Sequence, residues 1–317
     1  MADLQIINAV IDLGTNTCNL LIAEPSGNET FKVLHEERIA VKMGRGGIHQ
    51  KKLLPEAMER GLSALSLHKK SIQKHGASHV RLIGTSAIRG ASNRGEFSEM
   101  VRSQLGWELE VIDGNKEAEY IFRGTVNSLP PLQEKYLVLD IGGGSNEFIL
   151  AEGEKILWKK SFNIGIARVL ELFPMADPPL SSEIEHVEVW FEGHLHELDE
   201  ICRLHKPQIM VGCSGAFDTL MDILEEKEPD ATIRKSSVFP LADFYRIHDS
   251  LISVDREKRA KIAGVDKNRV EMIIIATIFI NFILRKLDIR ELIHTHFSLK
   301  EGVMFEMCSD ANKSLLC

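Results

Sequence analysis

The sequence has no long hydrophobic run and no pattern typical of an N-terminal leader. Its longest apolar stretch, Ile273 to Leu284, is about half of what a membrane helix needs, and it contains Asn281. The first residues, Met-Ala-Asp-Leu-Gln-Ile, do not combine a basic segment with an apolar one. We therefore expect a cytoplasmic protein that does not enter the membrane, with Ile273 to Leu284 as a buried helix.

Cysteine is scarce, and no two cysteines stand in a CxxC pair. This usage predicts reduced thiols and gives no zinc motif. The histidine pairs His194/His196 and His294/His296 have no further ligand at a suitable spacing, so we interpret both as structural. The cysteines are Cys18, Cys202, Cys213, Cys308 and Cys317.

An excess of positive charge is also missing. Lys and Arg number 38 against 46 Asp and Glu, which gives a net charge of -8. This balance argues against nucleic acid or an anionic membrane as partner, although it allows a local basic site for phosphates. With 317 residues, of which 44% are hydrophobic and 26% charged, the chain is long enough for two globular domains.

The most informative feature that is present is an internal repeat. Val10-Ile-Asp-Leu-Gly-Thr-Asn-Thr17 and Val138-Leu-Asp-Ile-Gly-Gly-Gly-Ser145 both run into an apolar strand that ends in Ala-Glu. One offset of 128 residues aligns them, so that Asp12 falls on Asp140 and Thr17 on Ser145. Two matching copies favour a ligand site over two unrelated structural hairpins.

The chemistry of this turn suits phosphate. Glycine lets the backbone approach a ligand closely, hydroxyl groups add donors, and a carboxylate can hold a hydrated Mg²⁺ ion. A dinucleotide-binding turn is disfavoured, because Glu147-Phe-Ile-Leu-Ala continues as a strand where that motif needs a helix. The predicted phosphate-binding residues are Gly14, Thr15, Asn16 and Thr17 in the first copy, and Gly142, Gly143, Gly144 and Ser145 in the second.

The chain divides naturally at Pro130-Pro131. On either side, strands alternate with helices such as Pro55 to Gly76, which has proline at its start and glycine at its end. We expect His79 to Ala87 to be a buried strand and Ser182 to His205 to be one helix. Each half then reads as a mixed α/β domain, with the ligand in the crevice between them.

Three further segments could line that crevice. Arg89 and Asn93 follow a buried strand. The guanidinium of Arg89 suits a phosphate oxygen, and we predict that Asn93 also binds phosphate. Glu117 lies in the first turn of a helix after a glycine turn. Ser214 and Gly215 open another helix, whose N-terminus can bind an anion.

Together these segments resemble the exopolyphosphatase and guanosine pentaphosphate phosphohydrolase (Ppx/GppA) family. That family shows DxGSNS, AT.A.R.A.N, SGxEEA, DIGGGSTE, GxSGT and LREG motifs. The matching residues here are Asp12 to Thr17, Thr85 to Asn93, Asp113 to Ala118, Asp140 to Glu147, Gly212 to Ala216, and Leu299 to Gly302. The resemblance covers nearly the whole chain.

The resemblance implies two ribonuclease-H-like domains of the actin-like ATPase, sugar kinase and Hsp70 superfamily, with an interdomain cleft. Domain I would hold residues 1–124, with a C-terminal helix 299–317 packing back on it, and domain II residues 125–298. Glu117 would be the general base, and Asp140, Glu147 and Arg89 would complete the catalytic set. Asp12, Asp140 and Glu147 would hold Mg²⁺, with Mn²⁺ as the alternative ion. The expected substrate is polyphosphate or pppGpp, and a homodimer is an expectation of the family.

Several positions depart from the family pattern and keep two other functions open. At Asn19 and Glu119 the family usually has a positively charged residue, and the loss of these charges suggests a weakly catalytic (p)ppGpp or polyphosphate sensor. The shared superfamily suggests an ATPase or kinase as a second alternative. The departures are Asn19, Glu119, Asn146, Ala216, Ala276 and Lys300.

Overall fold

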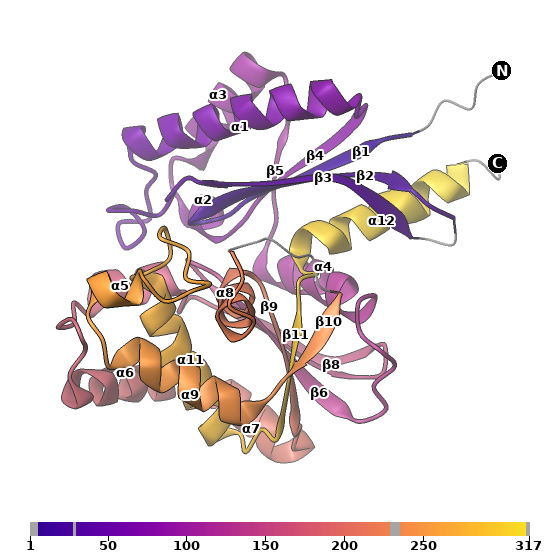
Figure 1. Cartoon of the computed structure of the whole chain (residues 1–317). Helices are drawn as coiled ribbons and strands as arrows, with labels where there is room; N and C mark the ends of the chain where they lie inside the picture. Colours follow the sequence, from indigo (N-terminus) through magenta and orange to yellow (C-terminus); the bar gives the residue numbers. More distant parts are fainter. Residues whose placement is uncertain (1–5, 28–29, 229–234, 315–317) are drawn as a thin grey trace. The chain divides into compact units, whose positions relative to one another are not determined.

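The computed structural model describes residues 6–27, 30–228 and 235–314. These residues form two compact units, one within Met1–Gly124 and Ser298–Cys317 and the other within Thr125–Phe297. Each unit has its own sheet and its own hydrophobic core (Figure 1). The cysteines of the described part, Cys18, Cys202, Cys213 and Cys308, are buried free thiols.

The first unit is built on a five-stranded sheet with the order β3-β2-β1-β4-β5. β1, β2 and β3 form an antiparallel meander, while β4 and β5 run parallel to β1. Val, Ile and Leu fill β1 because both of its faces are buried. The strands are β1 (Asn8–Leu13), β2 (Thr17–Pro25), β3 (Phe31–Ala40), β4 (His79–Gly84) and β5 (Leu109–Val111).

Helices cover both faces of this sheet, with α1 on one side and α12 on the other (Figure 1). α1 begins at Pro55 and is closed by Gly76 in a left-handed conformation (φ 70°), as its sequence predicted. The helices are α1 (Pro55–His75), α2 (Ser86–Gly90), α3 (Arg94–Leu105), α4 (Gly114–Val126) and α12 (Leu299–Ser314).

Two glycines let α12 cross α4 at backbone contact. A Cβ atom on Gly302 would lie 1.8 Å from the carbonyl oxygen of Tyr120, and one on Gly124 would lie 2.1 Å from that of Ser298. Any larger residue at either position would push the helices apart. The glycine of the Leu299-Lys-Glu-Gly302 segment is therefore a packing residue.

The second unit carries a six-stranded sheet with the order β10-β11-β9-β6-β7-β8. β6, β7 and β8 again form an antiparallel meander, β9 pairs parallel with β6, and β11 pairs parallel with β9. β10 adds an antiparallel edge. The strands are β6 (Lys135–Ile141), β7 (Asn146–Glu152), β8 (Lys155–Phe162), β9 (Ile209–Cys213), β10 (Ser236–Phe239) and β11 (Glu291–Thr295).

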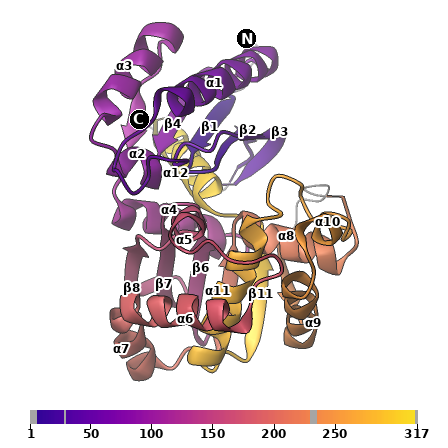
Figure 2. The same cartoon turned by 90° about the vertical axis from the view of Figure 1, so that its left-hand side faces the viewer.

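The core of the second unit forms around α11, the buried helix expected from the apolar run. Figure 2 shows α6 and α11 side by side over the sheet. Eleven of the 15 residues of α11 are buried, and Asn281 is half-buried. The helices are α5 (Ile166–Leu172), α6 (Ser181–His194), α7 (His196–His205), α8 (Gly215–Leu224), α9 (Leu241–Ile252), α10 (Arg256–Arg259) and α11 (Met272–Lys286).

The two sheets share one strand order once the extra edge strand β10 is set aside. β3-β2-β1-β4-β5 corresponds to β8-β7-β6-β9-β11, with the second strand of each meander antiparallel to the rest. A bulge even recurs at the same offset, between Ile22 and Ala23 in β2 and between Leu150 and Ala151 in β7. The prediction of two ribonuclease-H-like α/β domains is confirmed.

Two of the predicted elements were wrong in detail. The helix expected over Ser182 to His205 is interrupted at Leu195, whose backbone leaves the helical region (φ -110°, ψ 19°) while its side chain is fully buried in the second core. The strand expected over His79 to Ala87 ends at Gly84, and α2 follows directly. In both places tertiary packing overrides the local apolar pattern.

Candidate active site

The first glycine turn, Asp12–Thr17, joins β1 to β2. The backbone N–H of Gly14 donates to the carbonyl of Thr17 at 2.9 Å and closes the turn. Asp12 lies opposite Asn19 in the β1–β2 register, and Asn19 Nδ2 donates to Asp12 Oδ2 at 3.0 Å. The side chains of Asp12 and Asn19 therefore share one face of the sheet at the end of β1.

Thr15 is the member of this turn best suited to a ligand. Its hydroxyl is buried and has no hydrogen-bond partner among the described residues. A buried hydroxyl without a partner is costly, so such a group is usually explained by an unseen ligand, ion or water. Thr15 was among the predicted phosphate-binding residues.

The second glycine turn, Asp140–Ser145, has the same construction. Gly142 N donates to the carbonyl of Ser145 at 3.0 Å, and Asp140 lies opposite Glu147 in the β6–β7 register. Every one of these positions is displaced by 128 residues from its counterpart in the first turn. The repeat in the sequence is thus a repeat of the folded turn, and Glu147 stands where the first turn has Asn19.

Helix α5 holds the second turn in place from behind. Ile166 N donates to Gly142 O at 3.0 Å, Ala167 N to Gly143 O at 2.8 Å, and Arg168 Nε to Gly144 O at 2.7 Å. Because a trans peptide points its N–H away from its carbonyl, the N–H groups of Gly143, Gly144 and Ser145 are directed away from α5. Successive N–H groups on one side of a turn form an anion-binding cradle.

The sequence reasoning missed α5 and Gly165, on which this cradle depends. A Cβ atom on Gly165 would lie 2.5 Å from backbone atoms of Gly143 and Gly144. The only indication in the sequence is a glycine just after β8, in Asn163-Ile-Gly165.

Replacing Gly165 with alanine is expected to displace the second turn. The added methyl group would lower the free energy of unfolding by about 1–3 kcal/mol, as overpacking does. It should also reduce phosphate release about a hundredfold, because a shift of about 1 Å in a positioned group has that effect. Thermal denaturation and phosphate release measure the two effects.

Gly193→Ala is the matched control, since nothing lies within 4 Å of a Cβ at this position of α6. The control should leave activity unchanged and stability equal or raised, as for glycine to alanine in a helix. Equal behaviour of the two variants would show that Gly165 does not support the turn.

Two carboxylates meet beside the second turn. Glu147 Oε1 accepts hydrogen bonds from Ser145 Oγ at 2.7 Å and Ser161 Oγ at 2.6 Å. Asp140 Oδ2 accepts one from Ser214 Oγ at 2.6 Å. Asp140 and Glu147 are 6% and 1% exposed, so both carboxylates have lost most of their hydration. The hydrogen bonds from the serine hydroxyls offset part of the cost of this burial.

Ser214 is held in a conformation that favours glycine, with φ at 71°. Its hydroxyl bonds Asp140 and its carbonyl accepts from Asp218 N, so it links the carboxylate to the first turn of α8. The next residue, Gly215, leaves room for Arg269, whose Nη1 donates to Gly215 O at 2.8 Å. Backbone strain of this kind is typical of functional sites.

The carboxylates fit a hydrated Mg²⁺ ion in their chemistry. Mg²⁺ prefers oxygen ligands, keeps several waters and needs only one or two carboxylates from the protein. Asp140 and Glu147, opposite each other on β6 and β7, supply such a pair. The described residues contain no cluster of three or more metal-ligating side chains. Asp12 belongs to the other unit, and its role as a ligand stays a prediction.

Glu117 and Arg89 form an ion pair in the first unit. Arg89 Nη1 lies 2.6 Å from Glu117 Oε2 and also donates to Ile112 O at 3.2 Å. Glu117 is only 7% exposed, whereas a glutamate in the first turn of a helix is usually solvated. The guanidinium therefore fixes the orientation of a buried carboxylate.

Asn93 is engaged in a different contact. Its Oδ1 accepts from Leu53 N and its Nδ2 donates to Leu53 O, both at 2.9 Å. This pair of bonds braces the segment that precedes α1. The role of Asn93 in binding phosphate stays a prediction, as do the roles assigned to the other site residues.

The departures from the family pattern have structural partners. Asn19 Oδ1 accepts from Arg38 Nε at 3.2 Å, so a cation is present beside this position after all. Glu119 is exposed and 3.7 Å from Lys116. Lys300 pairs with Glu301 and with Glu36; burial opposes its charge, but these two carboxylates raise the pKa of Lys300. Asn146 is fully buried and donates to Ile164 O.

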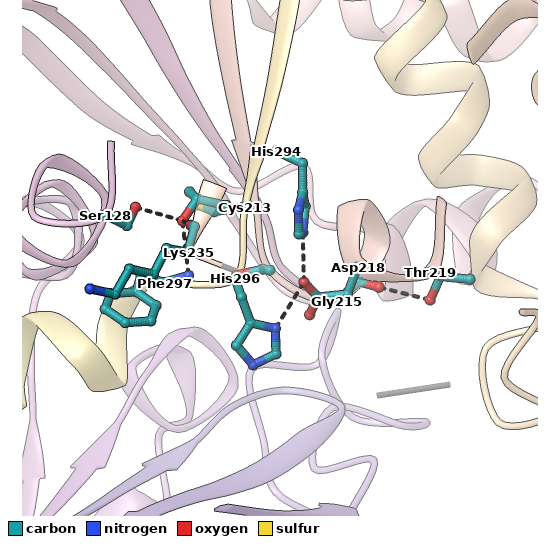
Figure 3. Close-up of polar contacts among 12 residues, drawn as sticks. Ser128, Cys213, Gly215, Asp218, Thr219, Lys235, His294, His296 and Phe297 are labelled. Atoms are coloured by element: carbon teal, nitrogen blue, oxygen red, sulfur yellow. Dashed lines mark hydrogen bonds and ion pairs between the residues drawn. The ribbon is translucent and has the colours of Figure 1, made fainter. Parts of the chain in front are cut away.

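A buried histidine and aspartate cluster lies one turn along α8 from Ser214. Figure 3 shows Asp218 between two imidazole rings of β11 and the residue that follows it, with His294 Nε2 at 2.9 Å and His296 Nδ1 at 3.3 Å from Asp218 Oδ1. Burial opposes ionisation, but the charge of His296 and the hydrogen bonds from both rings hold the pKa of Asp218 well below its usual range. This carboxylate partner of His294 and His296 was not foreseen, and the interpretation of the two histidines as structural stays a prediction.

Asp218→Asn is expected to lower the free energy of unfolding at pH 7 by about 3 kcal/mol, the effect of breaking a buried charge pair. Because the folded pKa of Asp218 is depressed, the stabilisation is present above the unfolded pKa of about 3.9 and is lost as the pH falls through the folded value. Urea denaturation at pH 7 and at pH 3 would show the difference between wild type and variant shrinking in acid. The exposed Asp249→Asn on α9 is the control, and a pH-independent difference would contradict this account.

The duplicated fold with its paired glycine turns defines a class, the two-domain α/β proteins with a ribonuclease-H-like core in each half. Within that class, the sequence pattern of the Ppx/GppA phosphatase family matches residues 21–311. The chain belongs to this family. No helix in the described part of the chain has the length and apolar character needed to cross a bilayer.

Individual relatives agree with this assignment. An exopolyphosphatase 2 from Mycobacterium tuberculosis is 32% identical over 84% of this chain and 86% of its own length. A guanosine-5'-triphosphate,3'-diphosphate pyrophosphatase from Vibrio vulnificus is 28% identical over 95% of this chain and 59% of its own length. The crystal structure of an exopolyphosphatase from Cytophaga hutchinsonii superposes with a TM-score of 0.90 at 35% identity, covering 96% of this chain and 98% of that one.

Proposed function

We propose that this protein is a Mg²⁺-dependent hydrolase that releases the terminal phosphate of inorganic polyphosphate, of pppGpp, or of both. The observation that carries the proposal is the carboxylate pair Asp140 and Glu147 beside a glycine turn whose N–H groups point one way. Family membership supports it, and relatives named for each of the two activities keep both substrates open. The proposal requires residues of both units to act on one substrate.

In this mechanism the N–H groups of the second turn and the hydroxyl of Thr15 bind phosphate oxygens. Glu117, held by Arg89, orients a water molecule and accepts its proton as it attacks the terminal phosphorus; a positioned base contributes about 10²- to 10⁴-fold. The bond to the bridging oxygen breaks, and the shortened phosphate chain leaves. Mg²⁺, held by Asp140 and Glu147, would neutralise phosphate charge.

We keep two alternative functions, each for a stated reason. Glu119, exposed on helix α4, stands where the family usually has arginine, so a positive charge that could serve turnover is missing; this motivates a protein that senses (p)ppGpp or polyphosphate with little turnover. An ATPase or kinase is the second alternative, because its fold would be the same. We further propose a cytoplasmic location, no nucleic-acid or membrane partner, and a homodimer.

The substrate panel that tests the proposal contains short polyphosphate, long polyphosphate, pppGpp and ATP, each with Mg²⁺, with Mn²⁺ and with a chelator. We expect metal-dependent phosphate release from polyphosphate or pppGpp and little from ATP, and the ranking identifies the substrate. Binding without release from any substrate would favour the sensor. Preferential release from ATP would favour the ATPase or kinase.

A further inference from the structure

The segment Lys42–Lys52, here called the basic loop, is unlike the rest of this acidic chain. It carries Lys42, Arg45, Lys51 and Lys52, and no acidic residue occurs between Glu37 and Glu56. All four side chains are exposed, and none of them forms an ion pair with a described residue. These cations are therefore available to an anion from outside.

The basic loop is attached directly to the first glycine turn. Val41 N and Lys42 N donate to Asn16 O at 2.8 and 3.0 Å, and Gly44 N donates to Thr15 O at 3.2 Å. A Cβ atom on Gly44 would lie 2.7 Å from Thr15 Cγ2, so the loop packs against the threonine whose hydroxyl lacks a partner. Lys42, the first cation of the basic loop, therefore lies beside the predicted phosphate-binding turn.

The conformation of the basic loop is fixed by its contacts with the rest of the first unit. Met43 and Leu53 belong to the first core and fasten the loop to it, and Ile48 is buried as well. Its far end is held by Ser92 N, which donates to Lys51 O at 2.8 Å, and by the Asn93 bonds to Leu53. Lys42 and Lys51 adopt left-handed backbone conformations with φ of 47° and 51°, which cost free energy and persist only where the surroundings impose them. The apolar residues point inward, and the charges are presented to solvent.

We propose that the basic loop binds the phosphate groups of the substrate that lie beyond its reacting end, and so selects long phosphate chains over short ones. The proposal rests on the proposed function. Unpaired cations on a braced loop attract a polyanion through its net charge, so the interaction grows with the number of phosphates and weakens with salt. A substrate of three phosphates would end at the first glycine turn, whereas a long polyphosphate would extend from that turn onto the loop attached to it.

The test compares Arg45→Gln/Lys52→Gln with the control Lys70→Gln/Lys74→Gln, which removes the same charge from exposed positions of α1. Neither loop position has a left-handed backbone, so the loop variant should fold, and thermal denaturation checks this. For long polyphosphate we expect the loop variant to raise KM about tenfold, with kcat unchanged and a weaker dependence of KM on salt. For tripolyphosphate, and for the control variant with either substrate, KM should stay within about twofold.

Equal KM changes for long polyphosphate and tripolyphosphate, or equal changes in the loop variant and the control, would overturn the proposal. A direct measurement keeps this test separate from the proposed function. If wild type releases no phosphate, the Kd of labelled long polyphosphate by fluorescence anisotropy still applies. A Kd raised about tenfold only in the loop variant supports the loop as a polyphosphate site, and an unchanged Kd overturns it.

Discussion

Glu117→Gln is expected to lower kcat for phosphate release about 10²- to 10⁴-fold, the contribution of a positioned general base. Glutamine keeps the size of the side chain and can still accept a hydrogen bond from Arg89, but it cannot take a proton from water. Stopped-flow detection of released phosphate gives kcat, and thermal denaturation shows whether the variant is folded. KM should change little, because the base acts on the water and not on substrate binding.

Glu119→Gln is the matched control. It lies two residues further along α4, carries the same charge and is exposed, whereas Glu117 is buried against Arg89. Its kcat should stay near that of wild type. A Glu117→Gln enzyme with wild-type kcat, or a control with the same loss, would remove Glu117 from the role of base.

Glu147→Gln is expected to weaken metal activation severely. We predict a rise of at least about tenfold in the Mg²⁺ concentration for half-maximal activity and a fall of about 10³-fold in activity at low Mg²⁺, because a ligand carboxylate and several kcal/mol of charge stabilisation are lost together. The hydroxyls of Ser145 and Ser161 can rotate to bond an amide, so the turn should survive the change. Mg²⁺ titration of phosphate release provides the measurement.

Glu152→Gln, at the exposed end of the same strand β7, is the control for this variant. It should titrate with Mg²⁺ as wild type does. An unchanged Mg²⁺ requirement in Glu147→Gln would mean that Glu147 serves only to hold Ser145 and Ser161.

Much of the fold could be predicted because its strongest features are local. The offset of 128 residues aligns two segments that prove to share one turn and one bulge, and Pro55 and Gly76 bound their helix as punctuation rules expect. The interruption at Leu195 could not be foreseen, because the residues around it keep helical spacing. Only the second core, which buries Leu195 fully, decides where the helix bends.

The residues of the candidate site also fall into those that local sequence indicates and those that only tertiary contacts define. Asp12, Asp140 and the glycines of the two turns could be identified as candidate site residues from the sequence alone, because an aspartate just before a glycine turn indicates a ligand site. Glu117 was found through the family motif alone, because its burial depends on Arg89, which lies 28 residues away. Gly165 and the partnership of Asp218 with His294 and His296 depend on contacts between distant segments, and no spacing in the sequence indicates them.

The most direct test of the central claim is hydrolysis in water enriched in ¹⁸O, followed by mass spectrometry of the released phosphate. Direct attack of water on the terminal phosphorus predicts one ¹⁸O atom in every phosphate released from polyphosphate or pppGpp. Released phosphate without the label, with ¹⁸O in the shortened chain, would mean that water attacks the neighbouring phosphorus. Transfer of the phosphoryl group to an acceptor other than water would point to a kinase-like reaction, and either result would contradict the account.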